Sequence, residues 1–354
     1  MDWNFIIFSA VKIAVVIGML LTMVAYSVLA ERKIAAWIQD RVGPNRAAPP
    51  FVKYIPVVGP FLTRLGFFQP LADGLKSLLK EDFMPAGVRK VYFWLAPAVA
   101  MVPALLAVAV IPFGSQLGSQ KMVIADLNVG ILYTFGIVSL GVYGIVLAGY
   151  AANSKYPMFG GIRSSAQMIS YEISMGMSVI PVLLIAGNLN LTQIIGWQSA
   201  HGWLVLYAPV SFVIFLVSAF AETNRMPFDL PEAEQELAGG YNVEYSSMKF
   251  ALFFLAEYSN MIASSGMMVT LFFGGWTLPF WGLDHAATTL LAGIAHILVF
   301  IAKMLFFMVV FIWVRWMFPR FRYDQLMDLG WRRFLPLALV NILVTAIWLW
   351  MTTK

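Results

Sequence analysis

Apolar stretches long enough to cross a membrane recur along the whole chain. A helix needs about 20 predominantly apolar residues to cross the roughly 30 Å hydrocarbon layer of a bilayer. The sequence is 60% hydrophobic, 12% charged and has a mean hydropathy of +0.79. We predict eight spans, at 5–30, 91–112, 129–151, 164–187, 203–223, 247–273, 288–314 and 334–352. The expected fold is an all-α polytopic membrane protein, a single integral membrane domain over 1–354.

The cations are distributed unevenly between the loops. Loops 31–90, 152–163, 224–246 and 315–333 hold 18 of the 23 lysines and arginines. Cytoplasmic loops carry such an excess of Lys and Arg. The sequence therefore predicts that these four loops face the cytoplasm and that both termini lie on the opposite, periplasmic side. The same rule accounts for the net charge of +5, so no nucleic-acid partner is expected.

The chain contains no cysteine and only three histidines, His201, His285 and His296. Iron–sulfur clusters are held mainly by cysteine thiolates, and haem iron in proteins is commonly bound by histidine. We therefore expect no metal and no cofactor to be bound by this chain alone.

The first cytoplasmic loop, 31–90, is too long to be a simple connector. Its part 70–81 places four leucines on one helical face, with Pro70 suited to the first turn. Those leucines are Leu71, Leu75, Leu78 and Leu79. We predict an amphipathic helix in the membrane interface. A helix packed against a soluble partner is the alternative, and both interpretations can hold together.

The acidic cytoplasmic loop 224–246 and the end of the preceding span form an unusual concentration of charge. Residues 221–236 hold five of the 18 acids, namely Glu222, Asp229, Glu232, Glu234 and Glu236. A short helix from Pro231 would explain two of them, because acids favour the positive end of a helix. We favour a cavity lined by these acids, in which ligand chemistry is coupled to protonation.

Three ionisable residues fall inside predicted spans at similar depths, roughly 14–17 Å from the cytoplasmic side at about 1.5 Å per residue. They are Glu172, Glu257 and Lys303. Each would cost roughly 2.5–3.5 kcal/mol or more facing lipid. A buried Glu–Lys pair that only aligns the helices is one explanation. A proton-coupling path is the one we favour, because a second glutamate is present.

Cations of the first loop lie close to the predicted membrane surface. Gly43 and Pro44 favour a sharp turn that would bring Arg41 and Arg46 together. On charge alone, contact with lipid headgroups is the preferred interpretation of these residues.

Several runs of the sequence resemble one family over almost the whole chain. They are ERK (31–33), RVGPNR (41–46), QPLADGLK (69–76), SYE (170–172), AETNRMPFDL (221–230), EY (244–245) and PRFRYDQ (319–325). In order and content they resemble the H subunit of bacterial respiratory complex I, the proton-pumping NADH:quinone oxidoreductase, whose mitochondrial relative is NADH dehydrogenase subunit 1.

The resemblance implies a membrane subunit that forms part of the quinone-binding chamber in the bacterial inner membrane. Quinone is then the substrate, while flavin and iron–sulfur clusters belong to partner subunits. The implied partners are hydrophilic-arm iron–sulfur and quinone-site subunits on the cytoplasmic side, small membrane subunits, antiporter-like subunits and lipids. Implied quinone-binding residues are Arg32, Arg41, Arg46, Asp73, Lys76 and Phe228. Implied proton-coupling residues are Glu172, Glu222, Asp229, Glu232, Glu234, Glu236 and Glu257, to which the depth argument adds Lys303.

One segment departs from many members of that family. Residues Ala47 to Phe68 form an apolar, proline-rich insert, which we expect to be an interfacial loop near the quinone entrance. Two other functions stay open. One is the membrane subunit of a related hydrogenase complex, and the other is an autonomous cation/proton antiporter. The sequence lacks the inverted repeats common among transporters, which disfavours the antiporter.

Overall fold

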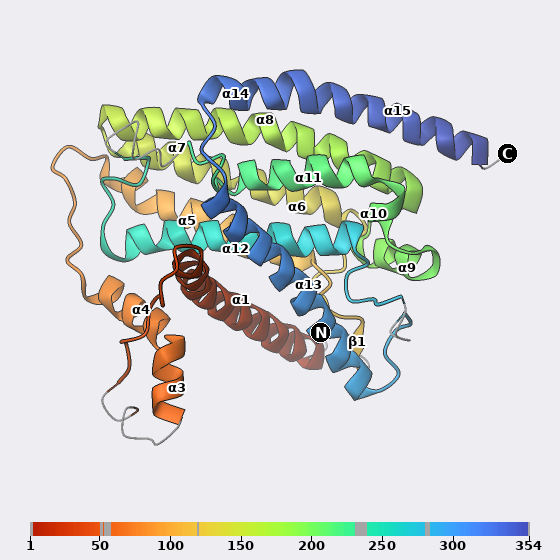
Figure 1. Ribbon diagram of the computed structural model, residues 1–354, viewed down its shortest axis with the longest axis horizontal. Coiled ribbons are helices and arrows are strands. Elements are labelled where there is room, and N and C mark those ends of the chain that lie inside the picture. Colours follow the sequence, from red (N-terminus) through yellow and green to blue (C-terminus); the bar gives the residue numbers. More distant parts are fainter. Residues whose placement is uncertain are drawn as a thin grey trace.

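The computed structural model describes residues 3–49, 52, 58–118, 120–230, 239–279 and 284–352. Almost all regular structure in them is helical (Figure 1). The first half of the chain forms α1 (Trp3–Ile38), α3 (Val58–Leu65), α4 (Gln69–Leu79), α5 (Lys90–Ala107) with the 3₁₀ turn η1 (Val108–Val110), the short strands β1 (Gln116–Leu117) and β2 (Gln120–Lys121), α6 (Gly130–Ser139) and α7 (Gly141–Ala151).

The second half begins with the longest helix after α1. It forms α8 (Lys155–Ala186), α9 (Leu191–His201), α10 (Leu204–Tyr207), α11 (Pro209–Glu222), α12 (Ser247–Phe272), α13 (Leu290–Met317), α14 (Tyr323–Asp328), the π-helical turn η2 (Leu329–Phe334) and α15 (Leu335–Thr352). The antiparallel pair β1–β2 is a small hairpin in the connection between α5 and α6.

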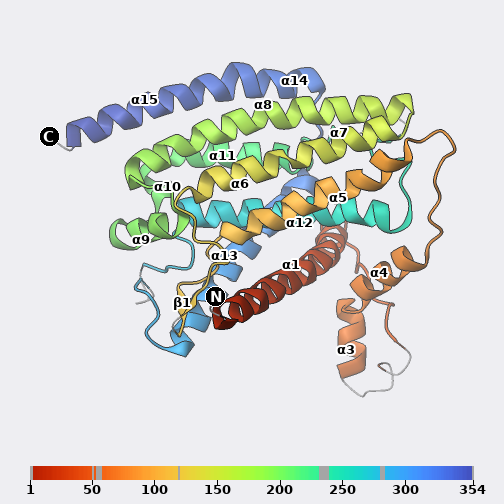
Figure 2. The ribbon, with the colours of Figure 1, turned by 180° about the vertical axis from the view of Figure 1, so that it is seen from behind.

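The long helices form one bundle. Helices α5, α7, α8, α11 and α12 pack against one another, α15 lies along α8, and α1 and α13 cross beside α12 (Figures 1 and 2). Large side chains from several of these helices fill the core, among them Tyr171, Phe215, Phe272 and Phe311. The first residues of α1 and the last of α15 lie at one end of the bundle, and α3, α4 and α14 lie toward the other (Figure 1).

The prediction of an all-α polytopic membrane protein is confirmed. All eight predicted spans contain helix. Within the described residues, six helical segments are long and apolar enough to cross a membrane: Ile6–Ile38, Lys90–Val110, Gly130–Ala151, Lys155–Ala186, Leu290–Met317 and Tyr323–Thr352. The shorter α11 and the more polar α12 are outside that set, so a count of eight crossings stays a prediction. Pro209, expected inside a span, instead starts α11, where a missing backbone N–H costs little.

The first loop contains the amphipathic helix that its pattern predicts, as α4. Its four leucines are exposed, so protein side chains of this chain leave that face uncovered. The insert differs from expectation, because Val58–Leu65 is a helix, α3, where we expected a loop. The turn from α3 to α4 packs on α1, since the ring of Phe67 lies 5.2 Å from that of Tyr26.

Candidate functional site

A cavity of about 860 Å³ lies between α1, α4, α12 and α13. Apolar side chains such as Val24, Val28 and Phe254 line one part of it, and charged groups such as Glu31 and Arg315 line another. Pockets for organic ligands commonly combine an apolar wall with a few placed polar groups. The cavity is therefore the strongest candidate for a ligand chamber in the described part of the chain.

Three of the six predicted quinone-binding residues meet at this cavity. Arg32, Arg41 and Asp73 line it. Arg32 Nη1 lies 2.6 Å from Asp73 Oδ2, and Gln69 donates to the other oxygen of Asp73 at 3.0 Å. The ion pair connects α4 to α1 at the edge of the cavity, and the gap between these two helices is called its opening below. Both side chains are partly exposed, so the pair contributes little to stability by itself.

The other three predicted residues lie elsewhere. Arg46 and Lys76 are exposed and are outside the lining of the cavity. Phe228 is 3% exposed and packs between the rings of Tyr171 and Phe321, at 5.4 Å from each. In this chain Phe228 is a packing residue of the turn after α11.

A buried ionic network begins at the wall of the cavity. The carboxylate of Glu31 accepts a hydrogen bond from Arg225 at 2.9 Å, one from the Tyr258 hydroxyl at 2.5 Å, and one from Arg315. The Nε of Arg225 lies 2.8 Å from Glu257 Oε1. Arg225 thus connects Glu31 in the cavity wall with Glu257 of α12, which is outside the lining of the cavity.

The turn after α11 positions Arg225. Asn224 adopts a left-handed φ of 52°, a conformation that asparagine tolerates better than most residues. Gln167 of α8 donates its side-chain amide to Ala221 O at 2.7 Å and to Phe228 O at 2.6 Å, which fixes both ends of the turn. The guanidinium of Arg225 also stacks over the Tyr258 ring, 4.3 Å from its centroid.

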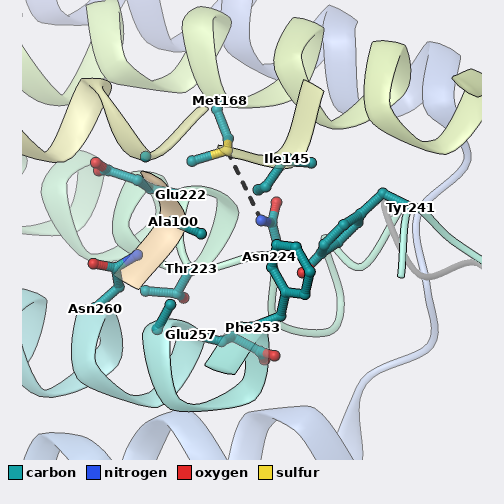
Figure 3. Close-up of a pocket in the computed structure, with 12 residues that line it drawn as sticks. Ala100, Ile145, Met168, Glu222, Thr223, Asn224, Tyr241, Phe253, Glu257 and Asn260 are labelled. Atoms are coloured by element: carbon teal, nitrogen blue, oxygen red, sulfur yellow. Dashed lines mark hydrogen bonds between the residues drawn. The ribbon is translucent and has the colours of Figure 1, made fainter. Parts of the chain in front are cut away.

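Two small spaces lie beyond Glu257, and Figure 3 shows the residues that line one of them. One of about 30 Å³ is lined by Glu222, Asn224, Glu257 and Asn260 among others, and one of about 20 Å³ by Glu222, Asn260 and Thr134 among others. A polar space of at least about 10–15 Å³ can hold a water molecule. Among the described residues, Glu222 Oε2 and Asn260 Oδ1 have no hydrogen-bond partner, so each space offers polar atoms to a water.

Two of the predicted carboxylates line these spaces, Glu222 both of them and Glu257 the larger one. Glu222 ends α11 and is buried, and the charge of Glu172 on the packed helix α8 acts on it. Glu172, Glu222 and Glu257 therefore form a series across α8, α11 and α12. The structure brings together what the sequence shows as three separate acids.

Asp229 lies in the turn that follows α11. Burial raises its pKa to about 6, even though Arg320, 3.2 Å away, favours the charged form. Its charge can therefore change near neutral pH. Glu232, Glu234 and Glu236 lie outside the described residues.

Lys303 differs from expectation. Its ammonium donates to three carbonyls that follow the end of α12, those of Phe273 (2.7 Å), Gly275 (3.0 Å) and Thr277 (2.6 Å). Phe273 lies 16 residues after Glu257, about 24 Å along the helix axis. The expectation that Lys303 lies at the depth of Glu257 is wrong, because the unpaired carbonyls at a helix C-terminus attract the cation.

Sequence reasoning missed most members of the ionic network. Glu31 stands beside Arg32 and Lys33 in the sequence, and no local pattern distinguishes Tyr258 or Arg315. Arg225 did carry a signal, since it is the one cation in loop 224–246, among acids. A lone arginine in an acidic segment predicts an ion pair, although the sequence does not identify its partners.

The apolar helices, the chamber and the buried network define a class: a polytopic helical membrane protein with a candidate ligand cavity joined to buried ionisable groups. Comparison with known proteins gives the family. The family model described as NADH dehydrogenase matches residues 11–346. The chain belongs to this family, and the resemblance seen in its motifs is confirmed.

Curated relatives match over nearly their full length, and all three of the following are H subunits of NADH-quinone oxidoreductase. The chain is 50% identical over 338 residues to the one numbered 1 in Geobacter metallireducens, covering 94% of each chain. It is 48% identical over 354 residues to that of Flavobacterium psychrophilum, covering 98% of each. It is 49% identical over 344 residues to that of Rhodospirillum rubrum, covering 97% of this chain and 94% of the relative.

Proposed function

We propose that this chain is the membrane subunit of a proton-pumping NADH:quinone oxidoreductase and forms the membrane part of its quinone chamber. The chamber is the cavity between α1, α4, α12 and α13. Its apolar wall suits a long-tailed lipid substrate, and its charged residues suit a polar headgroup. The names of the relatives, each an H subunit of NADH-quinone oxidoreductase, support the same substrate.

Electrons reach the quinone from outside this chain. With no cysteine in its sequence, the chain depends on partner subunits for iron–sulfur clusters and flavin. These partners dock on the cation-rich cytoplasmic side, near the opening between α1 and α4. Small membrane subunits and antiporter-like subunits complete the membrane arm. In this proposal the chain lies in the bacterial inner membrane with both termini on the periplasmic side.

In this proposal the chain transmits the change in charge that accompanies quinone reduction from the chamber to buried carboxylates. The observation that carries this proposal is Arg225, whose guanidinium contacts Glu31 in the chamber wall and Glu257 beside the small polar spaces. Two electrons from the partner subunits add negative charge to the quinone facing Glu31, until two protons convert it to the neutral quinol. Arg225 and its partners then shift in position or in proton affinity.

The size of such a shift is sufficient to move a proton. Two unit charges about 10 Å apart interact by roughly 1.7 kcal/mol at an effective dielectric constant of about 20. About 1.4 kcal/mol corresponds to one pKa unit. A change of one charge in the chamber therefore alters proton affinity at Glu257 by about tenfold, and Glu222 and Glu172 continue the path.

Glu257→Gln tests the proposal. The variant keeps the shape of the side chain and removes the charge that Arg225 contacts. In the assembled complex we expect quinone reduction with coupled proton pumping to fall roughly tenfold, equivalent to about 1.4 kcal/mol of barrier. NADH oxidation by a soluble artificial acceptor, which bypasses the membrane subunit, should be unchanged.

The matched control is Glu81→Gln, which removes an exposed glutamate of the first loop. It should leave both activities at wild-type level. Normal coupled turnover in Glu257→Gln would contradict the carboxylate path, and loss of the artificial-acceptor activity as well would indicate failed assembly.

A further inference from the structure

A second large cavity lies beside the quinone chamber but shares none of its lining residues. It has a volume of about 430 Å³ and lies between α1, α12, α13 and the connection 108–122. Its wall includes Val16, Met19, Ile262, Ile297 and Met304. Of the side chains that line it, Lys12 and Gln120 are the polar ones.

The cavity is long enough for a lipid chain. On α1 it extends from Phe8 to Met23, which is about 22 Å at 1.5 Å per residue. One leaflet of a bilayer contributes about half of the roughly 30 Å hydrocarbon layer. The lining of the quinone chamber begins at the next residue of α1, Val24, and continues toward the other end of the helix.

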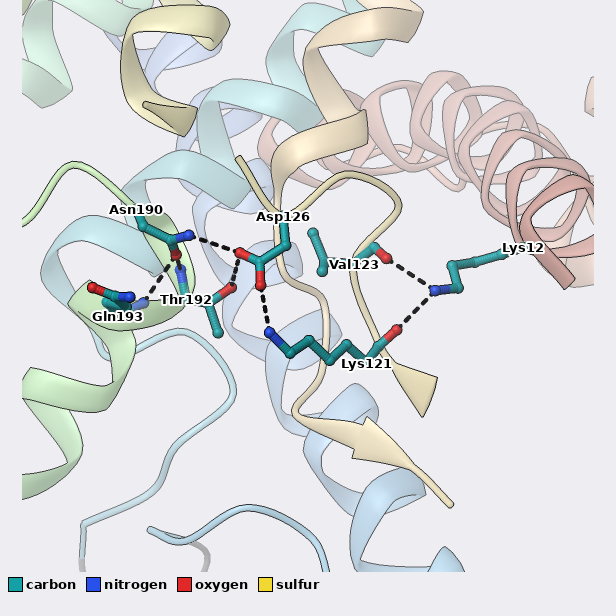
Figure 4. Close-up of polar contacts among 7 residues, drawn as sticks. All are labelled: Lys12, Lys121, Val123, Asp126, Asn190, Thr192 and Gln193. Carbon is teal, nitrogen blue, oxygen red and sulfur yellow. Dashed lines mark hydrogen bonds and ion pairs between the residues drawn. The ribbon is translucent and has the colours of Figure 1, made fainter. Parts of the chain in front are cut away.

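A cation, Lys12, lines this cavity one helical turn from Phe8, and Figure 4 shows its polar contacts. The Lys12 ammonium donates to Lys121 O at 3.0 Å and to Val123 O at 3.1 Å. An ammonium has three donors, so one N–H is left for a further acceptor. Lys121 pairs with Asp126 at 2.6 Å. These two lysines and one aspartate leave one positive charge in excess.

The group that holds Lys12 is itself anchored. Asp126 accepts hydrogen bonds from Asn190 at 2.8 Å and from Thr192 at 3.2 Å, both at the start of α9 (Figure 4). The carbonyls that position the ammonium thus belong to a segment tied to a second helix. The Lys12 ammonium is therefore held in place beside the cavity. A lysine that faced lipid without such contacts would be free to move.

We propose that this cavity binds an acyl chain of an anionic phospholipid, with the lipid phosphate on Lys12. Apolar walls alone do not distinguish a bound chain from the surrounding lipid, because both are equally apolar. The Lys12 ammonium can donate a charge-assisted hydrogen bond to the phosphate of any phospholipid. Selectivity comes from net charge, because the choline cation of phosphatidylcholine offsets its phosphate, whereas phosphatidylglycerol brings a net negative charge to the excess positive charge beside Lys12. The tail of a quinone carries no charge and would form no ionic contact with Lys12.

The test is photo-crosslinking of the intact complex in mild detergent. The probes are phosphatidylglycerol and phosphatidylcholine, each with a photoreactive group in one acyl chain. We expect phosphatidylglycerol to label peptides of α1 around 8–23 and of α13 around 297–304, and phosphatidylcholine to label them less. Lys12→Gln should reduce the phosphatidylglycerol label to the phosphatidylcholine level, whereas Lys155→Gln, at an exposed lysine that starts α8, should not.

A second variant fills the cavity without touching the cation. Val16→Phe should remove most of the label, and Val340→Phe on the exposed face of α15 should leave it intact. Equal labelling by the two lipids in the wild type would overturn the proposal. So would labelling of the same peptides by a quinone with a photoreactive tail in competition with phosphatidylglycerol. Quinone reductase activity, measured in parallel, reports separately on the quinone chamber.

Discussion

Arg225 shows how a single residue connects two parts of this site. Its guanidinium is buried and lies against two carboxylates from different helices, Glu31 of α1 and Glu257 of α12. Removing one partner of a buried ion pair commonly costs about 3–5 kcal/mol, because a charge is left without compensation. The network is therefore sensitive to any change in charge at one of its members, and in our proposal this sensitivity couples the chamber to the carboxylates.

Asp229 should titrate near neutral pH. Its pKa in the folded chain is about 6, against an ordinary value of 3.8. The sign follows from this direction: the carboxyl favours the folded state most when it is protonated, and that contribution is lost as pH rises from about 3.8 through about 6. Infrared spectra of the assembled complex should show a protonated carboxyl band that disappears near pH 6. The band should be missing in Asp229→Asn, and its persistence there would assign it to another group.

A substitution at Lys303 distinguishes a role in stability from a role in proton coupling. It holds three carbonyls after α12, and a hydrogen bond to a charged group contributes roughly 1.5–3 kcal/mol. We expect Lys303→Met to lower the thermal midpoint of the assembled complex by several degrees, while the quinone reductase rate per assembled complex stays near wild type. Lys155→Met is the control and should change neither. An unchanged midpoint together with lost proton pumping would instead support a coupling role.

At the scale of elements, the first loop is attached to the bundle at a few points. Lys33 donates to the carbonyls of Val42 and Arg64, Arg32 pairs with Asp73, and Gly66 lies against Pro44. These contacts place α3 and α4 beside α1 at the opening of the chamber. The position of the opening thus depends on the turn between α3 and α4.

Gly66→Ala should disturb that turn. Gly66 has a φ of +75°, and an added Cβ would come within 2.6 Å of Pro44 O. The left-handed conformation alone costs a non-glycine residue about 1–2 kcal/mol. We expect faster proteolysis of the first loop and a raised KM for quinone. Gly136→Ala, in α6 with open space around the added methyl, should change neither.

At the scale of the whole molecule, this chain needs partners to act. Its exposed apolar helices belong in a membrane, and in our proposal its chamber opens toward the subunits that supply electrons. In the same proposal the chain binds a lipid-soluble substrate and senses its charge. It lacks the cysteines that a bound iron–sulfur cluster would require.

Purification in mild detergent should therefore give a complex with flavin and iron and with NADH:quinone reductase activity. Elemental analysis and a flavin assay on the purified complex measure this directly. Nickel in place of quinone reductase activity would identify a hydrogenase complex. A chain that purifies alone and transports cations would contradict both enzyme assignments.

The sequence by itself determined the helical class, the positions of the long helices and the uneven distribution of charge. It also determined α4, because an amphipathic helix is specified by residues three and four apart. These features depend on the spacing of apolar residues and on the length of apolar run that spans a membrane. Both can be read from a linear sequence.

The tertiary structure alone decided which charged groups meet. Glu31 and Arg225 are 194 residues apart, and Glu31 and Arg315 are 284 apart. The charge of Lys303 would suit an ion pair with Glu257, yet its ammonium contacts the carbonyl of Phe273, just after the end of α12. Such pairings follow from the way distant helices pack, where burial requires each charge to find a partner close by. Local sequence patterns do not indicate which distant charges will pair.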